Sequence, residues 1–384
     1  MRSYTVGRIW GIPIRISVSL LVFLPVLAWL IGSGQQIAVY AGLVTGFTGT
    51  PLDLSVLRAG TTPWLIGAVA ALGLFVSVGI HELGHSWVAM RYGLSVESIT
   101  LWILGGLANL GSIPREWNRE FWIAVAGPIT SILVGAVCYV VAVALPSSLP
   151  ILVFVFGWLA VTNVSLAIFN MLPAFPMDGG RVFRALLARN RPYPIATRIA
   201  ARVGSAFALL FVVVGVLAFS PLLLLLAIFL YGASTTESRM VMLDSLLEGL
   251  TVADLLAPDA STVDAGDSVA SLLDRMLGER RTDFAVERGG SVVGTVSLSA
   301  VKAVPQDERG HRTVGDVTTE PTLRFDVEMD AFDAMSELSG SGDSVALVER
   351  DGRTVGVVSM TDFATMLQFI QSRNAERVGV RMGQ

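Results

Sequence analysis

Residues 81–85 read HELGH, and they lie inside an otherwise uncharged apolar run over residues 64–90. A helix places residues four apart on one face, so His81 and His85 can face one metal ion while Glu82 stands beside it as a general base. Ionisable side chains inside a membrane span are costly and are usually functional. The pattern therefore predicts a zinc site on a membrane-spanning helix, with a buried polar network between helices as the alternative.

The composition of the chain indicates a membrane protein. Of its 384 residues, 53% are hydrophobic and only 15% are charged, and the mean hydropathy is +0.66. Since a span needs about 20 apolar residues, the long apolar runs predict about six transmembrane helices. They lie within residues 16–31, 64–90, 121–145, 151–172 and 203–233, the last as a tight pair broken at Ser220-Pro221. One long tilted helix is the alternative for the last run, and the apolar piece 37–47 is expected to lie at the outer surface or to fold back.

Charge divides the chain into two parts. Residues 1–236 hold 13 Arg and six acidic residues, a net charge of +7, whereas residues 237–384 hold 14 basic and 25 acidic residues, a net charge of −11. We therefore expect a membrane domain over residues 1–240, joined by a linker over 241–250 to an acidic soluble part. The acidic part offers no basic surface, so nucleic acid is not expected as a partner.

Arginine positions predict how the spans are oriented, because short cytoplasmic loops are enriched in basic residues. Arginines precede the first span, lie between spans two and three and between spans four and five, and follow span six, whereas the other loops hold only Arg58. Both chain ends are therefore expected in the cytosol, in a multi-pass protein of the cell membrane. The arginines between residues 181 and 202 are expected on an interfacial helix beside anionic lipid head groups.

A third metal ligand is predicted at the end of the fourth span, where residues 170–180 read NMLPAFPMDGG. Two prolines break the helix there and place Asp178 on irregular backbone near the inner face, which at membrane depth requires surrounding protein or a water-filled cavity. Spans two and four run in the same direction, so Asp178 can meet His81 and His85 at one height. Two His and one carboxylate leave a fourth coordination position open, as in catalytic zinc sites. An ordinary Asp-Gly-Gly turn is the alternative.

Along nearly its whole length, the chain resembles the site-2 protease family, the intramembrane zinc metalloproteases (peptidase M50), in the subgroup with appended CBS domains. The HELGH stretch matches the family's His-Glu-x-x-His, and Asp178 with its two following glycines matches the Asp-Gly motif. The resemblance implies that His81, His85 and Asp178 bind one zinc ion and that Glu82 is catalytic. It also implies that Asn170 positions the substrate or the oxyanion, with a plain helix-end role as the alternative.

Two further segments carry the resemblance. Ala126-Gly127-Pro128 is similar to the family's Ala-Gly-Pro, but the asparagine often found three residues after the proline is Ser131 here. That departure concerns a secondary polar role rather than the zinc site. Segment 98–112 falls where the family places a membrane-associated β-hairpin near the substrate path. The implied substrate is a single-span membrane protein, cut within the lipid bilayer during regulated proteolysis.

The acidic part contains an internal repeat with an offset of 62 residues. Residues 251–254 (TVAD) recur as 313–316 (TVGD), and residues 293–297 (VGTVS) recur as 355–359 (VGVVS). Two copies of one module therefore follow, ahead of a C-terminal tail over 371–384.

Each copy has the pattern helix, strand, turn, strand and helix, which resembles a tandem pair of CBS domains over residues 251–305 and 313–370. The resemblance implies adenosine nucleotide binding. Ser359 and Asp362 match the Ser/Thr-x-x-Asp motif, whose carboxylate typically contacts ribose, whereas the first copy has Ala300 at the corresponding place. At most one well-equipped nucleotide cleft is expected, with a purely structural pair or a homodimer through the CBS domains as the alternative.

The expected fold is an α-helical polytopic membrane domain with a small β-hairpin, followed by an α/β tandem CBS domain. The expected function is an intramembrane zinc endopeptidase that acts on a single-span membrane protein and is gated by nucleotide binding to the CBS pair. The main alternative is a CBS-regulated metal-ion transporter or channel, in which the His and Asp residues line a metal pathway. A third hypothesis is an inactive scaffold that holds membrane partners.

Overall fold

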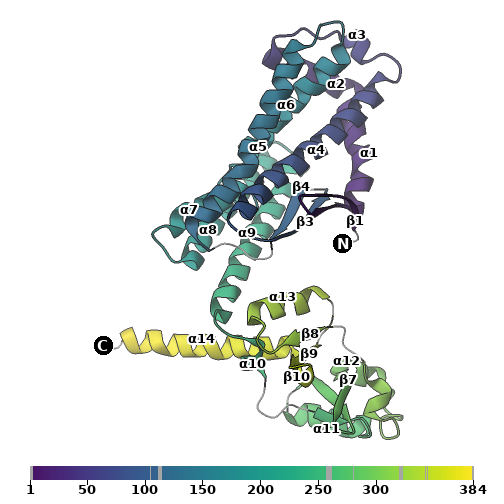
Figure 1. Ribbon diagram of the computed structural model, residues 1–384, viewed down its shortest axis with the longest axis vertical. Coiled ribbons are helices and arrows are strands. Elements are labelled where there is room, and N and C mark those ends of the chain that lie inside the picture. The colour runs from purple at the N-terminus through teal and green to yellow at the C-terminus, as the bar shows by residue number, and fades with distance from the viewer. Residues whose placement is uncertain are drawn as a thin grey trace. The chain divides into compact units, whose positions relative to one another are not determined.

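The computed structural model describes residues 3–103, 105–110, 115–256, 262–279, 281–319, 323–341, 343 and 345–382. Residues 104, 111 and 112 of the predicted hairpin and the last two residues of the predicted tail lie outside the described part. The chain divides into two compact units, Met1–Arg239 and Met240–Gln384 (Figure 1).

Helices form most of the first unit. In chain order they are α1 (Val18–Gly32), α2 (Gly34–Thr48), α3 (Leu54–Leu57), α4 (Thr62–Arg91), α5 (Trp117–Ala144), α6 (Pro150–Asn170), α7 (Asp178–Ala188), α8 (Tyr193–Leu217) and α9 (Pro221–Leu247). Five of these described helices, α4, α5, α6, α8 and α9, are long and apolar enough to cross a membrane. Together, α1 and α2 form a sixth apolar segment, bent by 72°.

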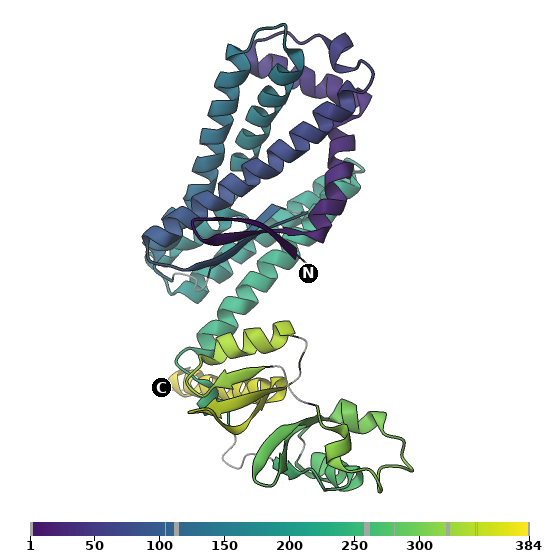
Figure 2. The same ribbon diagram turned by 45° about the vertical axis from the view of Figure 1, so that its right-hand side comes forward.

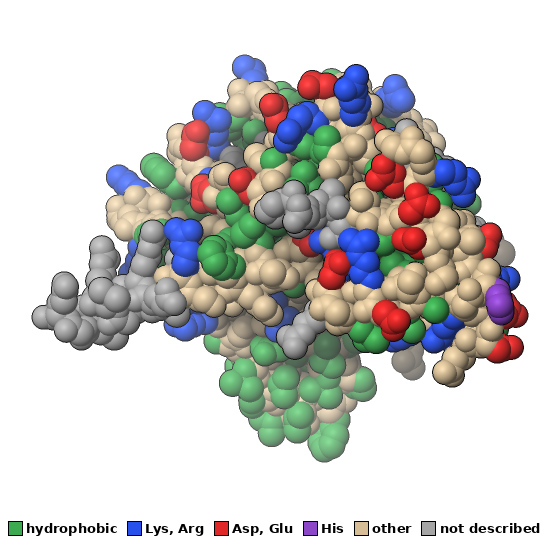
Figure 3. All heavy atoms as spheres, turned by 90° about the horizontal axis from the view of Figure 1, so that it is seen from below, with side chains coloured by type: hydrophobic (Ala, Val, Ile, Leu, Met, Phe, Trp, Pro, Cys, Tyr) green, Lys and Arg blue, Asp and Glu red, His purple; other side chains and the backbone are tan. Residues whose placement is uncertain are grey.

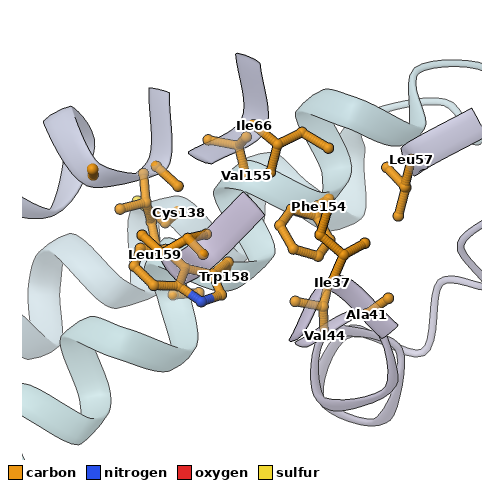
Figure 4. Close-up of a cluster of buried hydrophobic side chains, with 14 residues drawn as sticks. Ile37, Ala41, Val44, Leu57, Ile66, Cys138, Phe154, Val155, Trp158 and Leu159 are labelled. Atoms are coloured by element: carbon orange, nitrogen blue, oxygen red, sulfur yellow. The ribbon is translucent and has the colours of Figure 1, made fainter. Parts of the chain in front are cut away.

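The first predicted span differs from the observed helices. α1 has only 15 residues, about 22 Å of helix, which is shorter than the hydrocarbon core of about 30 Å. The apolar piece 37–47 belongs to α2, whose Ile37, Ala41 and Val44 are buried in one core with Phe154 of α6 (Figure 4). This piece was expected either to lie at the outer surface or to fold back, and in the structure it folds back onto the bundle.

The apolar run over residues 203–233 is confirmed as a pair of helices. α8 ends at Leu217 and α9 begins at Pro221, where proline suits the first turn because the N–H that it lacks would have no partner there. Both helices extend beyond the apolar run, to 25 and 27 residues. α9 continues to Leu247 and takes up most of the predicted linker over 241–250.

A four-stranded sheet lies against the bundle (Figure 2). Its strands are β1 (Ser3–Ile9), β2 (Ile12–Ser17), β3 (Val96–Trp102) and β4 (Gly105–Leu110), in the order β1-β2-β3-β4. The hairpin predicted within 98–112 is therefore half of a larger sheet, since the parallel pairing of β2 with β3 adds the N-terminal hairpin. Ile12, Ile14 and Ile16 alternate along β2 and pack into a core with Phe75 of α4.

Two copies of one arrangement make up the second unit. The first copy holds α10 (Val252–Leu255), β5 (Thr262–Asp264), α11 (Val269–Glu279), β6 (Asp283–Arg288), β7 (Ser291–Ser297) and α12 (Leu298–Ala303). The second holds the 3-10 helix η1 (Val314–Val317), β8 (Arg324–Asp326), α13 (Ala331–Ser341), β9 (Val345–Arg350), β10 (Arg353–Ser359) and α14 (Met360–Met382). Every element of the second copy begins 62 residues after its counterpart, so the predicted repeat is confirmed.

Each copy contains a three-stranded sheet, with the orders β5-β6-β7 and β10-β9-β8. The recurring TVxD stretch has a local cause: Thr251 with Asp254, and Thr313 with Asp316, form capping boxes that satisfy the first backbone N–H groups of short helices. The repeat therefore preserves a helix start, and its sequence alone marks no ligand site.

Acidic and basic side chains are interspersed on the surface drawn in Figure 3.

Candidate metal centre

Three side chains from two helices converge in the first unit. His81 and His85 lie one turn apart on α4, and Asp178 is the first residue of α7. The two Nε2 atoms are 3.2 Å apart, and they lie 3.2 and 3.3 Å from Asp178 Oδ2. His81 is 4% exposed and His85 8%. Within the described part of the chain, this is the one group of three such residues that could hold a metal ion.

The geometry of the group fits zinc. Zinc–ligand distances of about 2.0–2.2 Å place tetrahedral ligand atoms about 3.3–3.6 Å apart, which is close to the three observed separations. His85 Nδ1–H donates to the backbone oxygen of Ile123 at 2.6 Å, so in the neutral imidazole Nε2 carries the lone pair that a metal ion can take. Lone pairs and a carboxylate oxygen at these separations repel one another unless a proton or a metal cation lies between them. The donor set therefore suits a cation that accepts nitrogen and oxygen ligands.

α5 orients both imidazoles. His81 Nδ1 lies 2.8 Å from Ser131 Oγ, and His85 Nδ1 contacts Ile123. Gly127 lies between these two positions at intervals of four residues, so all three share one face of α5. A Cβ on Gly127 would lie 2.1 Å from His85 Nε2, so only glycine allows this close approach. In the sequence, Ser131 stood out only as a departure from the family motif. The four-residue spacing of positions 123, 127 and 131 is the signal that could have placed all three on one face of a helix.

Asp178 is placed differently from the sequence prediction. The irregular backbone covers residues 171–177, and Asp178 is already helical. A carboxylate in the first turn of a helix is favoured by the unpaired backbone N–H groups and by the helix dipole. The Asp-Gly-Gly stretch is therefore a helix start, and the alternative of an ordinary turn is wrong.

Glu82 lies beside the ligand group and against the sheet. It follows His81 directly on α4, and a Cβ built on Gly106 of β4 would lie 2.7 Å from Glu82 Oε1. No hydrogen bond engages the Glu82 carboxylate among the described residues. The carboxylate is thus available to exchange a proton.

Two asparagines of α6 have different surroundings. Asn170, the predicted polar residue, ends the helix half-buried, and no hydrogen bond joins its side chain to a described residue. Asn163 is fully buried, and its Nδ2 donates to Ser77 Oγ at 3.1 Å and to the Leu159 backbone oxygen at 2.8 Å. Ser77 precedes His81 by one helical turn. Asn163 therefore ties α6 to the helix of the histidine pair, a contact that no motif indicated.

In the second unit, the protein itself engages the predicted nucleotide residues. Asp362 Oδ2 accepts hydrogen bonds from the Ser359 backbone N–H at 2.9 Å and hydroxyl at 2.8 Å, next to the start of α14. Asp362 Oδ1 accepts from Arg281 Nη2 of the first copy at 3.1 Å. Both oxygens of the carboxylate that was expected to contact ribose therefore have partners.

A cavity of about 560 Å³ lies elsewhere in the second unit, within the usual size of ligand pockets. Residues from both copies line it: Thr262, Glu287, Gly290, Val292, Arg353, Thr354, Val355 and Gly356. Neither Ser359 nor Asp362 is among them. The structure thus does not place the predicted nucleotide motif in this cavity.

The chain is similar to known metalloproteases. Residues 69–211 match peptidase family M50, and residues 314–368 match the CBS domain. A zinc metalloprotease of Methanocaldococcus jannaschii is 29% identical over 372 residues, covering 96% of this chain and 97% of that protein. Rip3 of Mycobacterium tuberculosis, also named a zinc metalloprotease, is 32% identical over 378 residues, covering 94% of this chain and 92% of that protein.

Among solved structures, the site-2 protease from Methanocaldococcus jannaschii is 34% identical, covers 62% of this chain and 96% of that chain, and has a TM-score of 0.42. The M50 match contains His81, Glu82, His85 and Asp178. The similarity to Rip3 runs through both units. This chain therefore belongs to peptidase family M50, as a multi-pass membrane zinc metalloprotease with a C-terminal CBS module.

Proposed function

We propose that this protease cuts a membrane-spanning segment of a single-span membrane protein within the bilayer, near its cytosolic side. One observation carries the proposal: α4 has the length and composition of a membrane span, and its two imidazoles meet the Asp178 carboxylate within 3.3 Å. A hydrolytic site on such a helix suits a substrate that is itself in the membrane. The arginine-rich loops support cytosolic chain ends and a site near the inner face.

His81, His85 and Asp178 would hold the zinc ion. Zinc bound there supplies a Lewis acid that polarises the scissile carbonyl and lowers the pKa of water. Glu82 would take a proton from the attacking water and return it to the leaving nitrogen. Its position beside His81, without a competing hydrogen bond from the residues that the structure describes, supports this role. Asn170, whose side chain is likewise without a hydrogen bond among the described residues, would position the substrate carbonyl or the oxyanion.

The substrate segment would bind as an extended strand. A helical backbone hides its carbonyls in hydrogen bonds, so the segment must unwind before it can be cut. β4 is one of the two edge strands of the described sheet, and its Gly106 lies against Glu82. A strand added along this edge would have its backbone hydrogen bonds satisfied and would pass close to the general base.

Cleavage by the purified full chain in proteoliposomes tests this proposal. Wild type should cut a single-span model peptide, whereas Glu82→Gln should lose cleavage by about 10²- to 10⁴-fold, the range for a general base, and keep its zinc. Glu97→Gln, an exposed acid on β3, is the matched control and should cut normally. Metal flux without proteolysis, surviving in Glu82→Gln, would instead support the transporter or channel.

Adenosine nucleotide binding to the CBS pair would gate this activity. A ribose that took the Asp362 carboxylate would displace Arg281 of the other copy and break a contact between the copies. Such a ligand would favour one arrangement of the pair over another. Titration of the full chain with ATP or AMP, followed by cleavage rates with and without nucleotide, tests the gate. No nucleotide binding together with a dimer in solution would favour the dimerising role.

A further inference from the structure

One arginine of α7 is buried, although the arginines between residues 181 and 202 were expected at the lipid interface. Arg184 is only 1% exposed. Its Nε and Nη2 donate to Glu120 Oε1 at 2.7 and 2.5 Å, and its Nη1 donates to Glu237 Oε1 at 2.5 Å. Burial of charges is costly unless the partners are close and well oriented. The expectation for Arg184 is therefore wrong, because two acids from distant helices compensate its charge.

Aromatic rings complete the surroundings of this guanidinium. Its Cζ lies 4.9 Å from the ring centre of Phe175 and 4.9 Å from that of Tyr193, within the range of cation–π attraction. Phe175 belongs to the turn that leads into Asp178, and Tyr193 is the first residue of α8. Arg184 thus connects its own helix with α5, α8, α9 and the turn before Asp178.

The cluster shares a helix with the groups that orient the histidines. α5 carries Glu120, which holds Arg184, and also Ile123 and Ser131, which contact the two imidazoles. α7 is short, and Asp178 lies six residues before Arg184, about 9 Å along the axis. A helix this short moves nearly as one piece. The contact between Arg184 and Glu120 therefore attaches the helix that begins at Asp178 to the helix that contacts both imidazoles.

α9 contributes the second acid and extends beyond the first unit. Glu237 lies just before the boundary at Arg239, and the same helix runs on to Leu247. In the second unit, Leu247 is fully buried in a core with Phe325 of the second repeat copy. The helix that enters the CBS module is thus hydrogen-bonded to the helix that carries the third candidate ligand.

We infer that Arg184 is a positioning residue for the metal centre: bound to Glu120 and Glu237, it holds Asp178 at the distance that zinc requires and makes this distance depend on α9. The inference rests on the proposed zinc site. It differs from a purely structural role, in which the cluster would stabilise the bundle without affecting the affinity for metal. Zinc affinity therefore separates the two roles.

The test is a chelator competition that measures the zinc dissociation constant of the full chain in detergent, together with thermal unfolding of the metal-free protein. Arg184→Lys keeps the charge but loses the planar fork of donors, and it should weaken zinc binding about tenfold, as loss of an outer-shell contact does. Glu237→Gln should also weaken zinc binding, by less than Arg184→Lys, because it keeps the contact between Arg184 and Glu120. The variant with both substitutions should bind zinc no more weakly than Arg184→Lys alone, because the two substitutions act on the same contact between Arg184 and Glu237. Glu116→Gln, in an exposed pair with Arg119 at the start of α5, should bind zinc as wild type does.

Unchanged zinc affinity in folded Arg184→Lys and Glu237→Gln would overturn the inference, whatever their thermal stability. An equal loss in Glu116→Gln would overturn it as well, because the effect would then not depend on the cluster. If Arg184→Lys fails to fold, Glu237→Gln decides, since it keeps Arg184 and Glu120. Wild type that binds no zinc at all would reject the proposed function itself, before any variant is compared.

Discussion

Asp178 in the membrane unit and Asp362 in the CBS unit were both predicted to bind ligands, and the structure surrounds them differently. Their side chains are similarly shielded, at 13% and 19% exposure. Asp362 faces donors: the Ser359 N–H and hydroxyl and the Arg281 guanidinium. Asp178 instead faces two imidazole nitrogens whose other ring nitrogens already have partners. A buried carboxylate that faces fixed donors is satisfied by its own protein, whereas one that faces two imidazole nitrogens, which bind either a proton or a metal ion, can share a cation with them.

The largest effect is expected at Asp178. Asp178→Asn keeps the shape of the side chain but removes the charge and one acceptor oxygen, so zinc affinity should fall by at least about 100-fold, the upper end of what loss of an outer-shell contact costs. Chelator competition on the purified full chain measures this. Asp53→Asn, a change of the same kind at the exposed cap of α3, is the control. Retained zinc affinity in Asp178→Asn would remove the distinction between the two aspartates.

A smaller effect is expected at Ser131, which orients one imidazole. Ser131→Ala removes the partner of His81 Nδ1, so the ring loses a contact that orients it, and zinc affinity should fall by about tenfold. Ser131→Asn restores the residue often found in the family and should recover part of the affinity. Equal affinity in all three proteins would show that helix packing alone orients the histidines.

At Asp362, we expect a stability effect. Asp362→Ala removes the acceptor of the Ser359 N–H and the partner of Arg281, so the second unit should be destabilised by about 1–2 kcal/mol, the range for a lost helix cap. The first copy offers an internal comparison, because Ser297 caps α12 there without an aspartate, accepting from Ala300 N–H at 3.3 Å. Hydrogen exchange of α14 amides in the full chain measures the change. Lost nucleotide binding at unchanged stability would instead make Asp362 a ligand residue like Asp178.

Local sequence patterns predicted the parts of the candidate site that depend on spacing. The histidine pair follows from the helical period, and the position of Asp178 near the pair follows from the prolines and the shared direction of two spans. The partners of the imidazoles were missed, because contacts between α4 and α5 depend on how the helices pack. Ser131 and Gly127 acquire their roles only when their helix lies against the histidines.

Long-range pairing limited the rest of the prediction. Ile12, Ile14 and Ile16 alternate as in a strand, yet the parallel partner of this strand lies far along the chain, where Ile14 pairs with Ile99. Arg184 looked like an interfacial arginine because its partners, Glu120 and Glu237, are distant in sequence. No local pattern states which helices will bring these charges together. The repeat spacing of the CBS module, in contrast, can be read directly by comparing two stretches of the sequence, and it was predicted.

The smallest effect is expected at Asp283, a 7% exposed neighbour of Asp362 at the start of β6. Burial raises the pKa of this carboxyl; the hydrogen bond from Thr282 opposes the rise and the Asp362 charge adds to it. An acid whose pKa is raised on folding binds its proton more tightly in the folded state. Its contribution to stability is therefore present below the ordinary value of 3.8 and is lost as pH rises through the folded-state pKa.

Asp283→Asn cannot ionise, so it should not lose stability through this group. The variant should therefore become more stable relative to wild type as pH rises above 3.8. Hydrogen exchange of β6 amides in the full chain measures the difference, and Asp274→Asn, an exposed acid of α11, is the control. The same pH dependence in wild type and Asp283→Asn would mean that Asp283 ionises as readily in the fold as in the unfolded chain. The donors around Asp362 would then stabilise both ionised carboxylates, and the contrast with Asp178, which faces the two imidazole nitrogens, would be sharper still.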